Sequence, residues 1–263
     1  MRRMEKLKGR LIMASHSIGE AQDIPLRSLE ALRTADLLIF EEDRGARSAL
    51  KSAGIHREYL RYNEHDQKQT LEILTESFRN GKTAVYMSDQ GCPGLADPGR
   101  EIVRVAVREK AEIRVVPGPS SLTAAIAACP FDMAEFHFCG FAPRENEARE
   151  RQLMEWNTLG VPLALMDTPY RLAALLESCK KVFGENHMAT LALDLSGTEE
   201  VIWNDSLRAI HEGTKELGKL NFVLILDAGT GRRSLPSTRP ATPHRSHATQ
   251  KPALRSPGKW RRR

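Results

Sequence analysis

Two loops rich in glycine and proline constrain the fold of this chain more than any other feature. Residues 88–99 read SDQGCPGLADPG and follow an apolar run at residues 83–87. Residues 115–121 read VVPGPSS and precede a helical pattern. Glycine allows close approach of the main chain to a ligand and positive φ, and proline fixes the direction of the chain. Either loop alone could be an ordinary turn. Together they predict a ligand site, because open α/β sheets bind ligands at the carboxyl ends of their strands.

Composition limits the class of protein. A length of 263 residues allows one large domain or two small ones, and 41% apolar residues is ordinary for a globular protein. The sequence has neither an apolar run long enough to span a membrane nor a signal-peptide core, so we expect a cytoplasmic protein without a membrane partner. The cysteines form no Cys-x-x-Cys pair, which predicts reduced thiols and no metal site: Cys92, Cys129, Cys139 and Cys179.

Charge is unevenly distributed along the chain. The net charge is +5, from 39 Lys and Arg against 34 Asp and Glu. Ten of the basic residues and none of the acidic ones follow Asp227, so the preceding part holds 29 basic against 34 acidic residues, a balance of −5. Residues 230–263 also contain five prolines and no apolar period, and we predict that they are a basic disordered tail. Such a tail could add salt-sensitive RNA affinity, or it could be a dispensable extension.

The order of strand and helix patterns predicts an α/β fold, because strands that alternate with helices form parallel sheets with helices packed against them. In the first half, strands are expected at 10–14, 37–40, 85–87 and 113–116, and helices at 25–35, 47–52, 69–80, 100–110 and 121–128. In the second half, strands are expected at 136–138, 162–166, 189–193, 201–203 and 222–226, and helices at 146–159, 170–182 and 206–212. We predict two domains, 9–130 and 135–228.

The glycine-rich segment at residues 222–231, FVLILDAGTG, looks like the first motif of Rossmann methyltransferases. That motif needs a following helix and an acidic residue about 20 positions later. A proline-rich tail without acidic residues follows instead, so we do not expect a cofactor site there.

Taken together, eight motifs in order resemble those of the tetrapyrrole-methylase-fold (class III) S-adenosylmethionine methyltransferases. Among them the chain is most similar to the branch of bacterial 16S rRNA ribose 2′-O-methyltransferases. The motifs are SIGE (17–20), DIPLRSL (23–29), EEDR (41–44), YNEH (62–65), SDQGCPGLADPG (88–99), PGPS (117–120), GFAPRE (140–145) and DTPYRL (167–172). The resemblance spans residues 9–228.

The resemblance implies two α/β domains of the tetrapyrrole-methylase type with the cofactor cleft between them, and usually a homodimer. It implies S-adenosylmethionine as cofactor and 16S rRNA or the 30S subunit as partner, with methylation of a cytidine ribose 2′-oxygen. The residues that it implies around the donor are Ser17, Asp89, Gln90, Gly91, Cys92, Leu95, Ser120, Ser121, Asp167 and Ala192. Of these, residues 90–92 would act through their backbone, the main chain at Asp167 and Ala192 would cover the adenine, and the two serines could equally cap a helix.

A ribose hydroxyl has a high pKa, so its methylation needs a carboxylate or histidine to take the proton. The candidates are Glu42, Asp43, His65 and Asp97. His65 could instead be a surface histidine, Asp97 a helix cap, and residues 41–43 a solvated acidic turn. Four arginines could hold phosphates or carboxylates, or could be surface charges: Arg44, Arg47, Arg144 and Arg171.

The chain departs from the branch where RNA phosphates would bind. Ser17 replaces a proline, Glu145 replaces a lysine, and residues 194–198, DLSGT, lack the branch's basic residues. The loss of positive charge leaves two alternatives open: methylation of a tetrapyrrole or another small molecule, and a non-catalytic member that binds cofactor or RNA.

Overall fold

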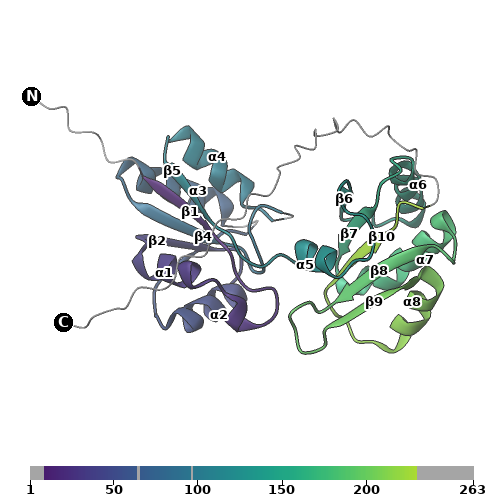
Figure 1. Ribbon diagram of the computed structural model, residues 1–263. Coiled ribbons are helices and arrows are strands. Elements are labelled where there is room, and N and C mark those ends of the chain that lie inside the picture. Colours follow the sequence, from purple (N-terminus) through teal and green to yellow (C-terminus); the bar gives the residue numbers. More distant parts are fainter. Residues whose placement is uncertain (1–8, 64–65, 96, 230–263) are drawn as a thin grey trace, which may run out of the picture. The chain divides into compact units, whose positions relative to one another are not determined.

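The computed structural model describes residues 9–63, 66–95 and 97–229, which form two five-stranded sheets with associated helices (Figure 1). The predicted tail at 230–263 and the candidate base His65 lie outside the described residues. In the part of the chain that the structure describes, no helix combines the length and apolar character that crossing a membrane requires.

The first sheet is entirely parallel. Its strands run in the order β3-β2-β4-β1-β5, so the carboxyl ends of all five lie along one edge. The elements of this half are β1 (Arg10–Ala14), a 3₁₀ turn (Ala21–Asp23), α1 (Leu26–Thr34), β2 (Leu37–Phe40), α2 (Asp43–Ala53), β3 (Leu60–Arg61), α3 (Gln67–Arg79), β4 (Thr83–Met87), α4 (Arg100–Arg108), β5 (Glu112–Val116) and α5 (Ser121–Ala127).

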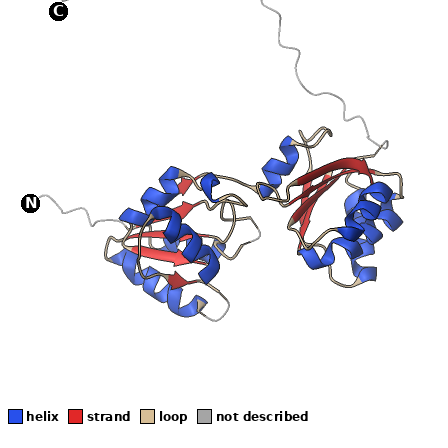
Figure 2. Ribbon diagram, turned by 90° about the horizontal axis from the view of Figure 1, so that it is seen from below, coloured by secondary structure: helices blue, strands red, loops and turns tan. Residues whose placement is uncertain are grey.

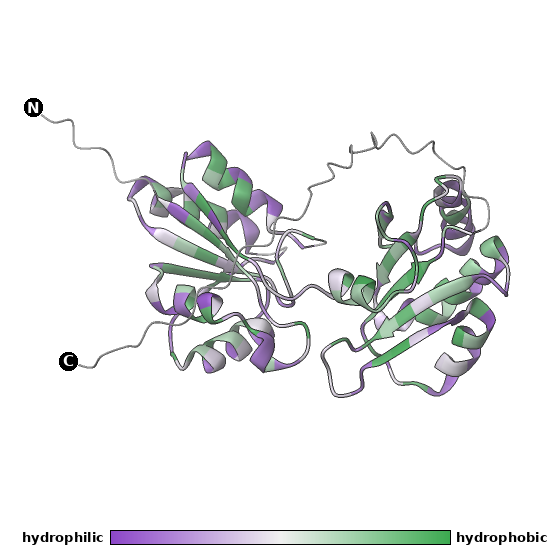
Figure 3. Cartoon of the chain, in the orientation of Figure 1, coloured by the Kyte–Doolittle hydropathy of each residue, from purple (hydrophilic) through white to green (hydrophobic). Residues whose placement is uncertain are grey.

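Helices cover both faces of this sheet. Because side chains alternate along a strand, Val85 and Met87 of β4 pack with α1 and α2, whereas Ala84 and Tyr86 pack with α3 and α4. All four are fully buried, and in the inner strands β2 and β4 the apolar residues are consecutive and do not alternate with polar ones (Figure 3). This is the pattern that a parallel sheet requires.

The second sheet is mixed. Its strand order is β6-β7-β10-β8-β9, in which β6 and β7 are parallel and every other pair is antiparallel. Figure 2 shows helices packed beside the strands in this half. Its elements are β6 (His137–Gly140), α6 (Asn146–Asn157), β7 (Leu163–Asp167), a 3₁₀ turn (Pro169–Arg171), α7 (Leu172–Phe183), β8 (Met188–Leu193), β9 (Val201–Ser206), α8 (Leu207–Gly213), a 3₁₀ turn (Thr214–Glu216) and β10 (Phe222–Leu226). The last strand in the sequence is therefore the middle strand of this sheet.

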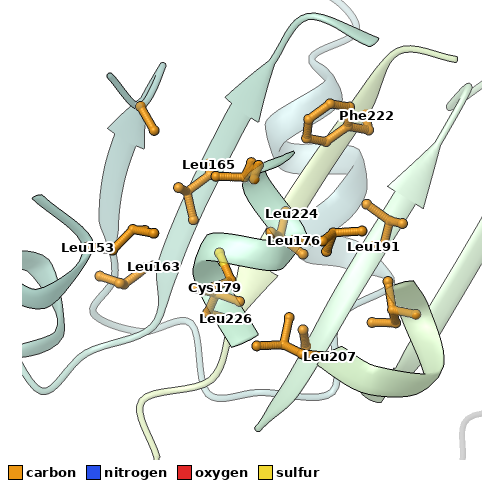
Figure 4. Close-up of a cluster of buried hydrophobic side chains, with 14 of the residues drawn as sticks. Leu153, Leu163, Leu165, Leu176, Cys179, Leu191, Leu207, Phe222, Leu224 and Leu226 are labelled. Atoms are coloured by element: carbon orange, nitrogen blue, oxygen red, sulfur yellow. The ribbon is translucent and has the colours of Figure 1, made fainter. Parts of the chain in front are cut away.

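The central strand β10 divides the core of this half into two clusters. Phe222, Leu224 and Leu226 pack against α6, α7 and α8 (Figure 4), while Val223 and Ile225 pack against α5. Helix α5 precedes the predicted domain boundary at 129–135, yet it covers a face of the second sheet.

The predicted strands and helices are confirmed to within two residues at each end, with three larger differences. Strand β3 was not predicted, because a strand of two residues is too short to show a pattern of apolar and polar residues. Helix α2 begins at Asp43 rather than at residue 47. Strand β9 continues three residues beyond the predicted end at 203.

Candidate functional site

The loops after β1 and β4 are pinned to each other through Gly91. Its carbonyl accepts the His16 amide at 2.9 Å, and its amide donates to the Ser17 carbonyl at 3.1 Å. Gly91 has φ of +69°, and a Cβ there would lie 3.1 Å from both Ile18 Cγ2 and the Pro119 carbonyl oxygen. Glycine is therefore required. Both backbone groups of Gly91 therefore bond within the chain, and the prediction that backbone groups of residues 90–92 hold the donor stays a prediction.

Asp97 fixes the later part of the same loop. Its Oδ1 accepts the Gly99 amide at 2.7 Å, and its Oδ2 accepts the Gly94 amide. Gly99 is the N-cap residue of α4, and no side chain among the described residues caps that helix, so Asp97 orders the loop before α4 and does not cap the helix itself. With both oxygens engaged, Asp97 is a weak candidate for the base.

A pocket of about 740 Å³ opens beside these loops, and we call it the carboxylate pocket. Five carboxylates and one guanidinium line it. The charged lining residues are Glu20, Glu41, Asp89, Asp97, Asp194 and Arg44, and the others include His16, Ser17, Gln90, Leu95 and Asn221. A pocket of this charge attracts hydrogen-bond donors and cations and repels phosphate.

Glu41 and Asp89 lie side by side in this pocket, because they follow the neighbouring strands β2 and β4. The Asp89 amide donates to Glu41 Oε2 at 3.4 Å, and the Glu42 amide donates to Asp89 Oδ1 at 3.2 Å. Burial raises the pKa of Glu41, and the nearby Asp89, Asp97 and Glu42 raise it further. Burial also raises the pKa of Asp89, which the Glu42 amide, His16 and Arg44 oppose.

His16 follows β1, the neighbour of β4 on its other side, and was missed by the sequence analysis. It is only 4% exposed; its Nδ1 lies 3.1 Å from Ser17 Oγ, and its Nε2 has no hydrogen-bond partner among the described residues. Burial lowers the pKa of His16, so the ring is neutral near pH 7. The available signal was its position directly after a predicted strand, at the edge where ligands bind.

A second pocket, of about 260 Å³, adjoins the first, and we call it the apolar pocket. The two pockets share Ile18, Gln90, Asp194 and Asn221. The apolar pocket brings together four of the predicted donor residues, Gln90, Ser121, Asp167 and Ala192, with Phe141, Met166, Leu195 and Val223 among the apolar ones.

Asp167 is the buried polar group of the apolar pocket. Its side chain is 0% exposed. Its Oδ1 accepts a hydrogen bond from the Thr168 amide at 2.7 Å and forms an ion pair with Arg171 at 3.1 Å. Its Oδ2 has no hydrogen-bond partner among the described residues. Arg171 also donates to the carbonyls of Ala142 and Pro143, both at 2.7 Å. Arg171 was predicted to bind substrate, but it serves to hold Asp167 and the 142–143 backbone in place.

The remaining candidates fall outside both pockets. Asp43 accepts a hydrogen bond from Tyr59 at 3.0 Å, lies 3.9 Å from Arg61 and lines a separate pocket with both. The side chains of Glu42, Arg47 and Arg144 are exposed, and those of Cys92 and Ser120 are half-buried, in neither pocket. The described residues that follow β10, 227–229, line neither pocket, whereas residues 221–223, at and just before the start of that strand, do so.

Comparison with known families defines the class of protein. The sequence profile of the family Tetrapyrrole (Corrin/Porphyrin) Methylases matches residues 10–211. The chain belongs to this family, and the predicted fold type and the predicted methyltransferase class are confirmed.

Within the family, the chain is similar to proteins named Ribosomal RNA small subunit methyltransferase I. It is 31% identical to the one from Leptospira borgpetersenii, over 88% of this chain and 92% of that protein. It is also 31% identical to the one from Thermotoga maritima, over 82% of this chain and 98% of that protein. A crystal structure of uroporphyrin-III C-methyltransferase from Thermus thermophilus, complexed with S-adenosylhomocysteine, shares the fold, with a TM-score of 0.59 and 18% identity over 84% of this chain and 98% of that one.

Proposed function

We propose that this protein is an S-adenosylmethionine-dependent methyltransferase of small-subunit ribosomal RNA that methylates the 2′-oxygen of a cytidine ribose in 16S rRNA. The observation that carries the proposal is its similarity to ribosomal RNA small subunit methyltransferases I over 88% of its length. We also propose that the protein is cytoplasmic, because its proposed substrate is ribosomal RNA.

The apolar pocket suits the donor. Asp167 Oδ2, a buried acceptor with no partner among the residues that the structure describes, can accept an amino hydrogen, and Phe141, Met166 and Val223 offer apolar contacts to a flat ring. When bound, S-adenosylmethionine supplies a methyl group already activated on a sulfonium. The protein's residues therefore act mainly by orienting donor and acceptor.

The carboxylate pocket, which shares four lining residues with the apolar pocket, suits the acceptor nucleoside. Its lining favours a ribose and base that donate hydrogen bonds. Phosphates are better held outside it, where Arg47 and Arg144 are exposed.

The same lining supports a second candidate function, methylation of a small molecule. The carboxylate pocket is lined by five carboxylates and by a single guanidinium, that of Arg44. This negative charge is unusual for a site that binds a polyanion such as RNA.

Labelled S-adenosylmethionine, offered with undermethylated 30S subunits or with a panel of tetrapyrroles, tests both functions. We expect label at one cytidine ribose of 16S rRNA and none in the tetrapyrroles. Label in a tetrapyrrole alone would support the second candidate and refute the first. Absence of donor binding in calorimetry would refute both and indicate a non-catalytic family member.

We further propose that the protein is a homodimer. Strand β5 lies at an edge of the first sheet and exposes Val115 (53%) and Ile113 (37%), and Leu26 of α1 is 82% exposed. Apolar residues on an open edge favour association. Light scattering coupled to size-exclusion chromatography measures the mass, and a monomer at micromolar concentration would contradict this proposal.

A further inference from the structure

We propose that Glu41 is the general base that removes the proton from the acceptor hydroxyl, with Asp89 beside it as the group that keeps it basic. This inference rests on the proposed function, because it needs a hydroxyl acceptor. It moves the base away from the four candidates that the sequence suggested.

Three neighbouring strands of the first sheet position the residues of the proposed base site. Residues Glu41, Asp89 and His16 follow β2, β4 and β1, which are adjacent in the first sheet, and all three line the carboxylate pocket. They form a row along the carboxyl edge, where α/β proteins bind ligands.

Each carboxylate is held by one oxygen only. Glu41 Oε2 accepts the Asp89 amide, and Asp89 Oδ1 accepts the Glu42 amide, so backbone groups of the neighbouring strand orient both side chains. Within the described residues, neither Glu41 Oε1 nor Asp89 Oδ2 has a hydrogen bond or is sealed from solvent. Asp97 differs, because two amides engage both of its oxygens.

The surrounding charges favour Glu41 over Asp89 as the base. Glu41 faces Asp89, Asp97 and Glu42, which disfavour its ionised form. The Glu42 amide and Arg44 stabilise the ionised form of Asp89. Burial raises the pKa of both carboxyls, and the three carboxylates around Glu41 make it the better placed of the two to act as a base near neutral pH.

One further group marks this pocket as a ligand site. His16, which lines the pocket, is 96% buried, and its Nε2 is unpartnered among the described residues. The Tyr86 hydroxyl is also buried and unpartnered among the described residues, but Tyr86 does not line this pocket. The Tyr86 pKa is raised by burial and then by Asp97 and Glu41, so it remains protonated and does not compete as a base.

The proposed step transfers a methyl group from the sulfonium of the donor to the ribose oxygen. Glu41 takes the proton from the ribose hydroxyl while the oxygen lone pair forms a bond to the methyl carbon. The carbon–sulfur bond breaks with its electron pair remaining on sulfur, which leaves S-adenosylhomocysteine, and Glu41 then releases the proton to solvent.

Single-turnover methylation of undermethylated 30S subunits between pH 5.5 and 9 tests the inference. Glu41→Gln should lower the rate about 10²- to 10⁴-fold and abolish the rise with pH. Asp89→Asn should move that rise to lower pH, since it removes the neighbouring negative charge. Glu58→Gln is the matched control, because Glu58 is exposed and lines neither pocket, and it should behave as wild type.

Two readouts do not depend on activity. Calorimetric affinity for S-adenosylhomocysteine should be unchanged within about threefold in Glu41→Gln, which separates proton removal from donor binding. Carboxyl NMR titration should show that the pKa of Glu41 falls in Asp89→Asn.

If Glu41→Gln retains the rate and pH profile of the active wild-type protein, the base is another residue and only this inference fails. If the wild-type protein binds donor but methylates no hydroxyl acceptor, the proposed function fails and the inference fails with it.

Discussion

Arg149 offers the sharpest test of how this site is supported. It is 2% exposed in α6, and in the described part of the chain no carboxylate pairs with it. Its guanidinium instead donates to five oxygens, at distances of 2.5 to 3.3 Å: Ser178 Oγ, Asn146 Oδ1 and the carbonyls of Pro143, Arg144 and Ala174. These bonds tie the GFAPRE segment, which includes the pocket residue Phe141, to α7.

Arg149→Leu removes all five bonds. Arg144 and Ala174 are exposed, so their carbonyls can recover water, whereas Ser178 Oγ and the half-buried Pro143 carbonyl have poorer access to it. At about 1–3 kcal/mol for each acceptor left without a partner, we expect a loss of about 3 kcal/mol in the free energy of unfolding. For a folded unit of this size, that corresponds to a fall in Tm of about 6–12 °C.

Urea unfolding followed by circular dichroism measures the loss, and calorimetry with S-adenosylhomocysteine measures the expected weakening at the apolar pocket. Arg151→Leu, two residues along the same helix, is the control. Its side chain is 70% exposed, and its ion pair with Glu147 is long at 3.9 Å. The loss in the free energy of unfolding should therefore stay below about 0.5 kcal/mol. Equal stability of the two variants would refute the view that Arg149 holds this segment. Full rescue by Arg149→Lys would show that charge matters rather than the five bonds.

Three further predictions concern the pockets. Gly91→Ala should cost about 1–2 kcal/mol in unfolding free energy, because its φ is +69°, whereas Gly218→Ala, with open space around it, should cost less. Asp167→Asn should weaken S-adenosylhomocysteine binding about 10- to 150-fold in calorimetry, because it removes one charge-assisted hydrogen bond. An unchanged Kd would show that the donor binds elsewhere. His16 has a lowered pKa, so the folded state binds fewer protons than the unfolded state and stability falls as pH drops below 6.5. His16→Gln should therefore lose less stability than wild type between pH 7.5 and 5.5, and equal losses would refute the assignment.

Much of the fold follows from local signals in the sequence. Short apolar runs predicted four of the five strands of the first sheet, all but the two-residue β3. Its parallel direction follows from the intervening helices, since parallel strands need long crossovers. The start of α2 was placed too late because Gly45 lowers helix propensity. The structure explains this glycine, since a Cβ there would lie 2.4 Å from Asp89 Oδ1.

The candidate site was harder to predict, because motif position does not reveal what a side chain contacts. Asp97 and Arg171 stand in motifs that suggest chemistry, yet backbone groups engage both: amides of its own loop bond to Asp97, and the carbonyls of Ala142 and Pro143, in another motif, accept from Arg171. His16 and the pairing of Glu41 with Asp89 depend on strand order, which places β2, β4 and β1 together although they are distant in sequence.

The position of β10 has a consequence for synthesis of the protein. The first sheet is complete once residue 116 has left the ribosome, but the second sheet lacks its middle strand until residue 226 emerges. Until then β7 and β8 present unpaired inner edges, and both core clusters lack their central members. Folding during translation is therefore sequential, and a nascent chain stalled before residue 222 would carry one finished sheet and one aggregation-prone half.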